Sequence, residues 1–114
     1  MTTPRRGEIW WVDLNPTRGH EQSGKRPGLV ISDDIFNEGP AELVVVLPLT
    51  TRDKKIPVHE KIIPPEGGLA DISYIKCEDI RSVSKKRLSA RIGKVEERTM
   101  LAVQEKIKIL LSFW

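Results

Sequence analysis

The stretch Leu43-Val44-Val45-Val46-Leu47 is an uninterrupted apolar run near the middle of the chain. Its valines are β-branched, and a run this short fits a strand better than a helix. Continuous apolar runs of this kind are typical of strands that are buried on both faces of a sheet. We therefore predict a central strand that continues through Pro48-Leu49 and ends at Thr50-Thr51.

Two further strands are predicted before this run. Residues 8–14, EIWWVDL, are rich in strand formers and are flanked by Gly7 and by Asn15-Pro16. Residues 27–32, PGLVIS, form the second strand, because a strand tolerates a proline in its first position. The polar, glycine-containing segment 15–25 between them is predicted to be a long loop.

The segments after the central strand predict more short strands and one helix. Alternating apolar and polar residues indicate a half-exposed strand over residues 56–62, and residues 72–77 and 80–83 predict two others. Beyond Lys94 the apolar residues recur at helical spacing, and no good N-cap residue precedes Glu96. The apolar stripe of this helix consists of Met100, Val103, Ile107, Leu110 and Trp114.

These patterns predict one domain over residues 1–114, with a mainly β fold and a C-terminal α-helix packed against a small twisted or barrel-like sheet. The composition, 39% hydrophobic and 31% charged, is that of an ordinary globular chain. An apolar run of about 18 residues and an apolar signal segment are both absent, so we expect a cytoplasmic protein that does not enter the membrane. Cys77 is the only cysteine, which excludes an internal disulfide.

Positive charge is concentrated in one part of the sequence. The chain has a formal net charge of +3, and residues 76–94 are especially basic. Such a density favours a polyanionic partner, with a solvated charged surface as the alternative interpretation. The cations of this stretch are Lys76, Arg81, Lys85, Lys86, Arg87, Arg91 and Lys94, against the acids Glu78 and Asp79.

The sequence gives little support to the usual hydrolytic or metal sites. His20 and His59 are the only histidines, and each is most simply a surface or hydrogen-bonding residue. Two histidines without a cysteine cluster match no usual metal-ligand spacing, so no metal site is predicted. Asp33-Asp34 are adjacent, and neighbours do not share a face of a strand or helix. A phosphate loop, a nucleophile elbow and a dinucleotide fingerprint are all missing.

Polar residues at strand ends remain as candidates. Arg26 precedes the strand 27–32, and Thr50 closes the central strand. We expect the two residues to share one rim if these strands run in the same direction, and to lie at opposite ends if the strands are antiparallel neighbours. The sequence alone does not decide between these arrangements. Structural interpretations are also open, since threonines commonly end strands and a cation before a proline can simply be solvated.

Five blocks, in their order and spacing, resemble the MazF/PemK family of bacterial toxin ribonucleases. The resemblance runs from about Arg6 to the final helix. It implies an SH3-like barrel of the CcdB/PemK type, a homodimer, and cleavage of single-stranded RNA at short sequence motifs without a metal or cofactor. The blocks are RGEIWWVDLNP at 6–16, GHEQ at 19–22, RPGLVIS at 26–32, VLPLTT at 46–51 and DIRSV at 79–83.

The resemblance also implies roles for individual residues. Matched by motif, Arg26 and Thr50 are the catalytic pair, with Glu21 and His20 in a supporting position nearby. The chain departs from the family pattern at His20, where serine is frequent, and at Asp79, where glutamine is common. An acid at position 79 would disfavour a nearby phosphate. The RNA-binding residues implied in the same way are Gln22, Lys25, Thr51, Asp79, Arg81 and Ser82.

The implied reaction is attack of a ribose 2′-hydroxyl on its own phosphate, which gives a 2′,3′-cyclic phosphate and a 5′-hydroxyl. Because the nucleophile belongs to the substrate, the enzyme supplies mainly alignment and charge stabilisation. The fork of Arg26 suits two phosphate oxygens, and the Thr50 hydroxyl can donate to a non-bridging oxygen. A guanidinium rarely gives up its proton in proteins, so we expect a phosphate clamp first and an acid–base role second, with His20 as an alternative proton carrier.

Two other classes of function are open. CcdB-type gyrase poisons resemble the family in fold and act through a tryptophan near the chain end, but Leu110 and Trp114 continue the helical stripe, which favours packing. A non-catalytic RNA-binding module would retain RNA without making products. The resemblance also implies a cognate antitoxin whose acidic segment covers the RNA groove, with residues 76–94 offering the complementary charge. Trp10-Trp11 can serve either the core or a dimer interface.

Overall fold

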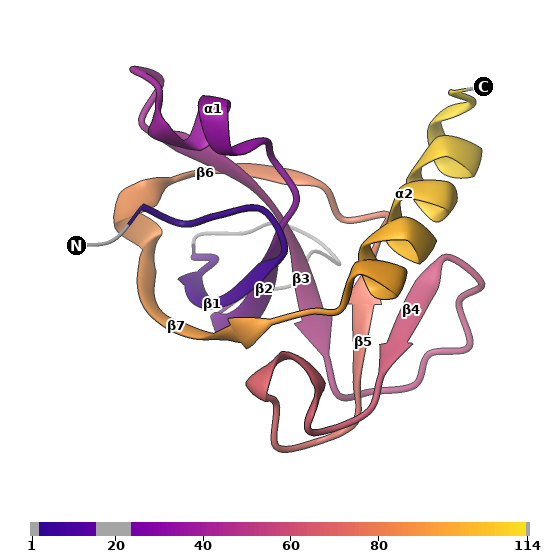
Figure 1. Ribbon diagram of the computed structural model, residues 1–114. Coiled ribbons are helices and arrows are strands. Elements are labelled where there is room, and N and C mark those ends of the chain that lie inside the picture. The colour runs from indigo at the N-terminus through magenta and orange to yellow at the C-terminus, as the bar shows by residue number, and fades with distance from the viewer. Residues whose placement is uncertain (1–2, 16–23, 114) are drawn as a thin grey trace.

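The computed structural model describes residues 3–15 and 24–113. A seven-stranded antiparallel sheet forms the body, and helix α2 (Glu97–Leu111) lies against one side of it (Figure 1). The strands are β1 Glu8–Asp13, β2 Lys25–Val30, β3 Leu43–Thr50, β4 His59–Ile62, β5 Ser73–Lys76, β6 Arg81–Ser84 and β7 Leu88–Lys94. The short helices are α1 Asp34–Glu38 and the 3₁₀ turns η1 Glu66–Gly68 and η2 Lys85–Arg87.

Strand β3 is the centre of the sheet, as its apolar run predicted. It pairs with β2 along one edge, and with β6 and then β5 along the other. Val44, Val46 and Leu47 are completely buried. Burial on both faces explains why this segment carries no alternating polar side chains.

Two clusters of buried side chains lie on the two faces of β3. Leu47 and Leu49 belong to the cluster that Met100 and Val103 of α2 complete. Val46 alternates with these leucines and belongs to the second cluster. That cluster also contains Trp10, Val12, Leu14, Val30, Val44, Val83 and Leu88. Of the two neighbouring tryptophans, Trp10 is therefore a core residue, whereas Trp11 is 43% exposed.

The strands follow the order β4-β5-β3-β2-β1-β7, with β6 paired to β3. Over residues 3–15 and 24–113, no strand pairing joins β7 to β4 or β6, so the sheet is not closed and the word barrel describes it only loosely. The predicted fold class, mainly β with a C-terminal α-helix, is confirmed.

Several element boundaries differ from the prediction. β2 begins at Lys25, so Arg26 lies within the strand rather than before it. β4 covers only the end of the predicted strand 56–62. β7 and α1 were not predicted. A local signal for α1 does exist, because the Asp33 carboxylate caps the helix by accepting a hydrogen bond from the backbone N–H of Ile35 at 2.9 Å.

Helix α2 begins without a capping side chain of its own, which agrees with the weak N-cap in the sequence. Glu96 occupies the N-cap position, and its side chain makes no capping hydrogen bond. Glu66 of η1 performs this role from a distance. Its Oε2 accepts hydrogen bonds from the backbone N–H of Glu96 at 3.0 Å and from the Thr99 hydroxyl at 2.5 Å. A carboxylate at this end of a helix is also favoured by the helix dipole.

The apolar stripe of α2 packs only along the first part of the helix. Met100 and Val103 are buried, and Ile107 is partly buried against the core. Leu110 is 39% exposed, so within this single chain the expectation that it packs is wrong, while Trp114 lies outside the described residues. Figure 1 shows the C-terminal part of α2 projecting past the sheet. Among the described helices, none combines the length and apolar character that a membrane span requires.

Candidate active site

Arg26 and Thr50 meet at one end of the paired strands β2 and β3. The strands are antiparallel, with Gly28 opposite Pro48. Continuing this register by two residues brings Arg26 opposite Thr50, and residues opposite each other in a sheet point to the same face. The expectation that antiparallel strands would separate the two residues was wrong, because the start of one antiparallel strand lies beside the end of its neighbour.

Thr50 is more deeply buried than its neighbour across the strands. The residue is 5% exposed, whereas Arg26 is exposed. The Thr50 hydroxyl oxygen accepts a hydrogen bond from the backbone N–H of Arg52 at 3.2 Å, which leaves the hydroxyl proton able to donate to another acceptor. Tyr74 of β5 lies directly opposite Thr50 and brings its side chain to the same face.

A group of charged side chains lies on this face at the other edge of β3. Arg81 is opposite Val46, which shares a face with Thr50 by the two-residue period of the strand. Asp79 accepts two hydrogen bonds from Arg81, from Nε at 2.7 Å and from Nη2 at 2.8 Å. Lys76 Nζ lies 3.5 Å from the second carboxylate oxygen. All three side chains are largely buried, with exposures of 12% for Arg81, 14% for Asp79 and 4% for Lys76.

Asp79 is ionised because of these partners. Burial alone would raise the pKa of its carboxyl group, but the hydrogen bonds from Arg81 and the positive charges of Arg81 and Lys76 hold that pKa below its ordinary value. Two cations and one acid leave the group with a net positive charge. The negative charge that the sequence places at position 79 is therefore already matched within the protein.

Arg81 also lines a cleft of about 340 Å³ between β6, η2 and the end of β1. On its far side, Arg87 donates hydrogen bonds to the backbone oxygens of Asp13, at 3.1 Å, and of Asn15. The Asn15 side-chain oxygen in turn accepts a hydrogen bond from the backbone N–H of Gly24 at 3.1 Å. Both ends of the connection between β1 and β2 are thus fixed next to this cleft.

Apart from Asp79 and Arg81, the other predicted site residues that the structure describes are not gathered on this face. Lys25 alternates with Arg26 along β2, and Ser82 alternates with Arg81 along β6, so each points to the opposite side of its strand. Thr51 follows the end of β3 and is exposed. His20, Glu21 and Gln22 lie outside the described residues.

Lys76 and Tyr74 are site residues that the sequence reasoning missed. Both belong to the predicted strand 72–77 and lie two positions apart, so strand periodicity alone places them on one face. The missing information was which strand lies beside them.

The basic stretch 76–94 is not one continuous exposed surface. Lys76 is buried beside Asp79, and Arg91 donates a hydrogen bond to the mostly buried Glu8 at 2.7 Å. Part of the stretch is therefore engaged within the fold, which reduces the charge that it can offer to a partner.

His59 is a hydrogen-bonding residue, as predicted, although it is buried rather than on the surface. Its Nε2 lies 2.9 Å from Glu78 Oε2. Its Nδ1 is buried without a hydrogen-bond partner in the described part of the chain. Across residues 3–15 and 24–113, no three His, Cys, Asp or Glu side chains gather in a way that could hold a metal ion.

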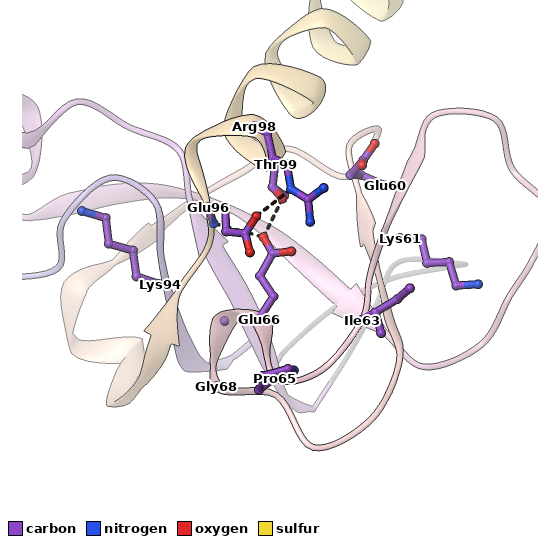
Figure 2. A pocket seen from close by; sticks show the side chains of 11 residues that line it. Glu60, Lys61, Ile63, Pro65, Glu66, Gly68, Lys94, Glu96, Arg98 and Thr99 are labelled. Atoms are coloured by element: carbon purple, nitrogen blue, oxygen red, sulfur yellow. Dashed lines mark hydrogen bonds and ion pairs between the residues drawn. The ribbon is translucent and has the colours of Figure 1, made fainter.

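A larger cleft of about 830 Å³ lies between β4, η1 and the start of α2 (Figure 2). Two of its acidic side chains have hydrogen-bond partners among the residues that line it, and the third, Glu60, pairs with Lys106. Glu66 turns toward the start of α2 and binds Thr99, while Glu96 accepts a hydrogen bond from Arg98 at 2.6 Å. Because Glu66 binds the start of α2, this cleft helps to hold the helix in place, and the candidate chemistry lies at Arg26 and Thr50.

Comparison with known proteins identifies the family of this chain. A family model described as "PemK-like, MazF-like toxin of type II toxin-antitoxin system" matches residues 5–111. Endoribonuclease EndoA of Bacillus subtilis (strain 168) is 35% identical over 109 residues, which cover 95% of this chain and 94% of that protein. Endoribonuclease MazF9 of Mycobacterium tuberculosis is 35% identical over 115 residues, which cover 96% and 98%.

Solved structures agree with the sequence relatives. MazF from Deinococcus radiodurans matches with a TM-score of 0.87 and 27% identity, covering 99% of this chain and 100% of that one. An endoribonuclease in complex with its cognate antitoxin, from a mycobacterial species, matches with a TM-score of 0.80 and 25% identity over 97% of each chain. At the level of the family, the expectation of an RNA-cleaving enzyme is confirmed, since the relatives are named endoribonucleases. The chain belongs to the PemK-like, MazF-like toxin family of type II toxin–antitoxin systems.

Proposed function

We propose that the chain is a cytoplasmic toxin that cleaves single-stranded RNA at short sequence motifs without a metal ion, and that a cognate antitoxin neutralises it. The observation that carries this proposal is the register of β2 and β3, which puts Arg26 and Thr50 on one face at one end of the sheet. Family membership supports the same reading, because a structural relative is bound to its antitoxin and sequence relatives are named endoribonucleases.

The proposed reaction needs little covalent chemistry from the protein. The 2′-oxygen of a ribose bonds to the adjacent phosphorus and loses its proton, while the bond from phosphorus to the next 5′-oxygen breaks and that oxygen gains a proton. Arg26 holds two non-bridging oxygens with its fork, and the Thr50 hydroxyl donates to one of them. Negative charge on these oxygens grows in the transition state, so donors already in place stabilise it more than the substrate. The products carry a 2′,3′-cyclic phosphate and a 5′-hydroxyl.

Mixed-sequence single-stranded RNA, incubated with the purified chain in excess EDTA, tests this proposal. Product ends are read by mass spectrometry for wild type, for Arg26→Ala, and for the control Arg98→Ala, which removes an exposed arginine at the start of α2. We expect cyclic-phosphate fragments from wild type and control, and a rate lower by about 10²–10³ from Arg26→Ala. Intact RNA with a correctly folded wild type would reject the ribonuclease and direct attention to gyrase binding.

We also propose that the toxin is a homodimer in which a second copy covers the end of α2. Apolar side chains remain exposed there, including Ile109 at 60%, Leu111 at 43% and Phe113 at 62%. Several exposed large apolar side chains close together in the chain favour an interaction site. Light scattering should therefore give the mass of a dimer for wild type and of a monomer for Ile109→Lys. A monomeric wild type at micromolar concentration would contradict this part of the proposal.

A further inference from the structure

Asp79 and Arg81 form a fixed pair next to the proposed catalytic residues. Both carboxylate oxygens of Asp79 are used, one by Arg81 Nε and the other by Arg81 Nη2, at 2.7 and 2.8 Å. This two-point contact determines the plane of the guanidinium as well as its position. Arg81 also lines the 340 Å³ cleft.

Lys76 also contacts the carboxylate of Asp79. Its side chain is 4% exposed, and its ammonium nitrogen lies 3.5 Å from Asp79 Oδ2. Because the lysine is buried, its charge has little water around it, and the carboxylate beside it provides the compensating charge. Asp79 therefore cannot swing toward solvent without leaving Lys76 uncompensated. The carboxylate is a fixed support for Arg81.

A fixed arginine has an advantage when it binds RNA. An unsupported arginine loses rotamer freedom when a phosphate or base immobilises it, and this loss opposes binding. An arginine already oriented by a carboxylate has lost that freedom during folding. Strand β6 also ties Arg81 to β3, through its pairing with Val46, so its position is set relative to Thr50 on the same strand.

We propose that Asp79 is a positioning residue, which orients Arg81 to contact RNA bound across Arg26 and Thr50. The proposal rests on the proposed function and deepens it, because it assigns a productive role to an acid that charge alone would make unfavourable. Asp79 touches no substrate in this scheme. It acts through Arg81.

The change Asp79→Asn separates orientation from charge, because the two predict opposite signs. The variant raises the net charge of the protein by one, so attraction to a polyanion alone predicts tighter RNA binding. Loss of orientation predicts weaker binding, because an amide offers only one acceptor and no charge to the guanidinium. Glu42→Gln is the matched control, since it makes the same charge change at a side chain that is 77% exposed.

Binding is measured with mixed-sequence single-stranded RNA carrying 2′-O-methyl groups, which lacks the nucleophile and stays intact. We expect Asp79→Asn to raise Kd about two- to tenfold, the effect of immobilising one flexible side chain, and to lower kcat/KM on cleavable RNA. Glu42→Gln should leave Kd unchanged or lower it slightly. A Kd for Asp79→Asn that equals or falls below that of the control would overturn the proposal.

A second variant keeps the test decisive if Asp79→Asn does not fold. Arg81→Lys retains the positive charge but loses the fork. We expect it to weaken binding of the same RNA, and in the double variant the two losses should be less than additive. Unchanged binding by Arg81→Lys, or strict additivity, would overturn the proposal. Because 2′-O-methyl RNA reports binding alone, failure of the ribonuclease proposal would show separately, as absence of cleavage by wild type.

Discussion

Two charged regions of the molecule use their charges in different ways. In the 830 Å³ cleft at the start of α2, the carboxylate of Glu66 accepts hydrogen bonds from the helix N-terminus. On the face that carries Arg26 and Thr50, the carboxylate of Asp79 accepts hydrogen bonds from Arg81. The group formed by Asp79, Arg81 and Lys76 keeps a net positive charge. The first arrangement completes a fold. In the function proposed above, the second arrangement orients Arg81 for contact with RNA.

The contrast shows that the size of a hollow is a poor guide to chemistry in a small toxin. The acids of the larger cleft already accept hydrogen bonds from donors inside the protein, so they are less available to a ligand. On the proposed catalytic face, a substrate phosphate would find the Thr50 hydroxyl and the exposed Arg26. Changes at each region should therefore affect different measurements, catalysis at the one and stability at the other.

Removing the Thr50 hydroxyl should have the largest effect, and on catalysis. Thr50→Val keeps the shape of the side chain but loses the donor to the phosphate, so we expect the single-turnover cleavage rate to fall by about 10²–10³. Thr50→Ser restores the hydroxyl and should recover most of the rate. Equal rates for the valine and serine variants would remove Thr50 from the active site.

The packing beneath the larger cleft should give the next largest effect, and on stability. Gly68 and Gly24 have similar positive φ values of 74° and 78°, so alanine at either position costs about 1–2 kcal/mol of backbone strain. At position 68, however, a Cβ would lie 2.3 Å from the backbone oxygen of Ile92, whereas at position 24 no neighbouring atom of the described residues lies within 4 Å. Urea unfolding should show Gly68→Ala to be less stable than Gly24→Ala by a further 1–3 kcal/mol or so. Equal losses would contradict the backbone contact.

The remote cap on α2 should have a moderate effect. Glu66→Ala removes the acceptor for the Glu96 N–H and the Thr99 hydroxyl, and we expect a loss of about 1–2 kcal/mol in the free energy of unfolding. Glu97→Ala, which removes an exposed acid from the first turn of α2, is the control. The rate of RNA cleavage should not change in either variant. A slower Glu66→Ala enzyme with intact stability would break the proposed division between the two regions.

The smallest effect should appear at low pH. Although burial opposes it, the hydrogen bonds and charges of Arg81 and Lys76 leave the pKa of Asp79 below its ordinary value of 3.8. A lowered pKa contributes stability that is complete above the ordinary value and is lost as the pH falls through the folded-state value. The Asp79→Asn variant should therefore lose less stability than wild type when the pH is lowered below the ordinary pKa of 3.8, as measured by urea midpoints. Parallel acid profiles would show that Asp79 carries no such linkage.

The strands and the helix that could be predicted from the sequence are those whose apolar residues show the pattern within one continuous segment. The run in β3 and the stripe at Met100 and Val103 are local signals, and both elements formed where expected. β7 was missed because most of Leu88–Lys94 is at least partly exposed, which leaves little apolar alternation. α1 was missed because five residues are too few to establish a helical period, although Asp33 offered a capping signal.

Relations between distant residues were not predictable in the same way. The approach of Arg26 to Thr50 depends on which strands pair and in which direction, and packing of the whole chain decides this. The cap from Glu66 to Glu96 joins residues that are 30 positions apart, with no local sign of the connection. The candidate pair itself came from resemblance to a family, and the register then supplied a physical reason for it.

Cys77 can report how often the core of this protein unfolds enough to expose it. The thiol of the chain's only cysteine is completely buried, and burial raises its pKa to about 12. At neutral pH a thiol reagent therefore meets neither an accessible sulfur nor a thiolate. Only a molecule whose core has opened can be labelled, so the labelling rate in native buffer counts opening events without a dye, a tag or a denaturant. Repeated in the presence of an antitoxin, the same reaction would show whether that partner slows the opening of the core or leaves its rate unchanged.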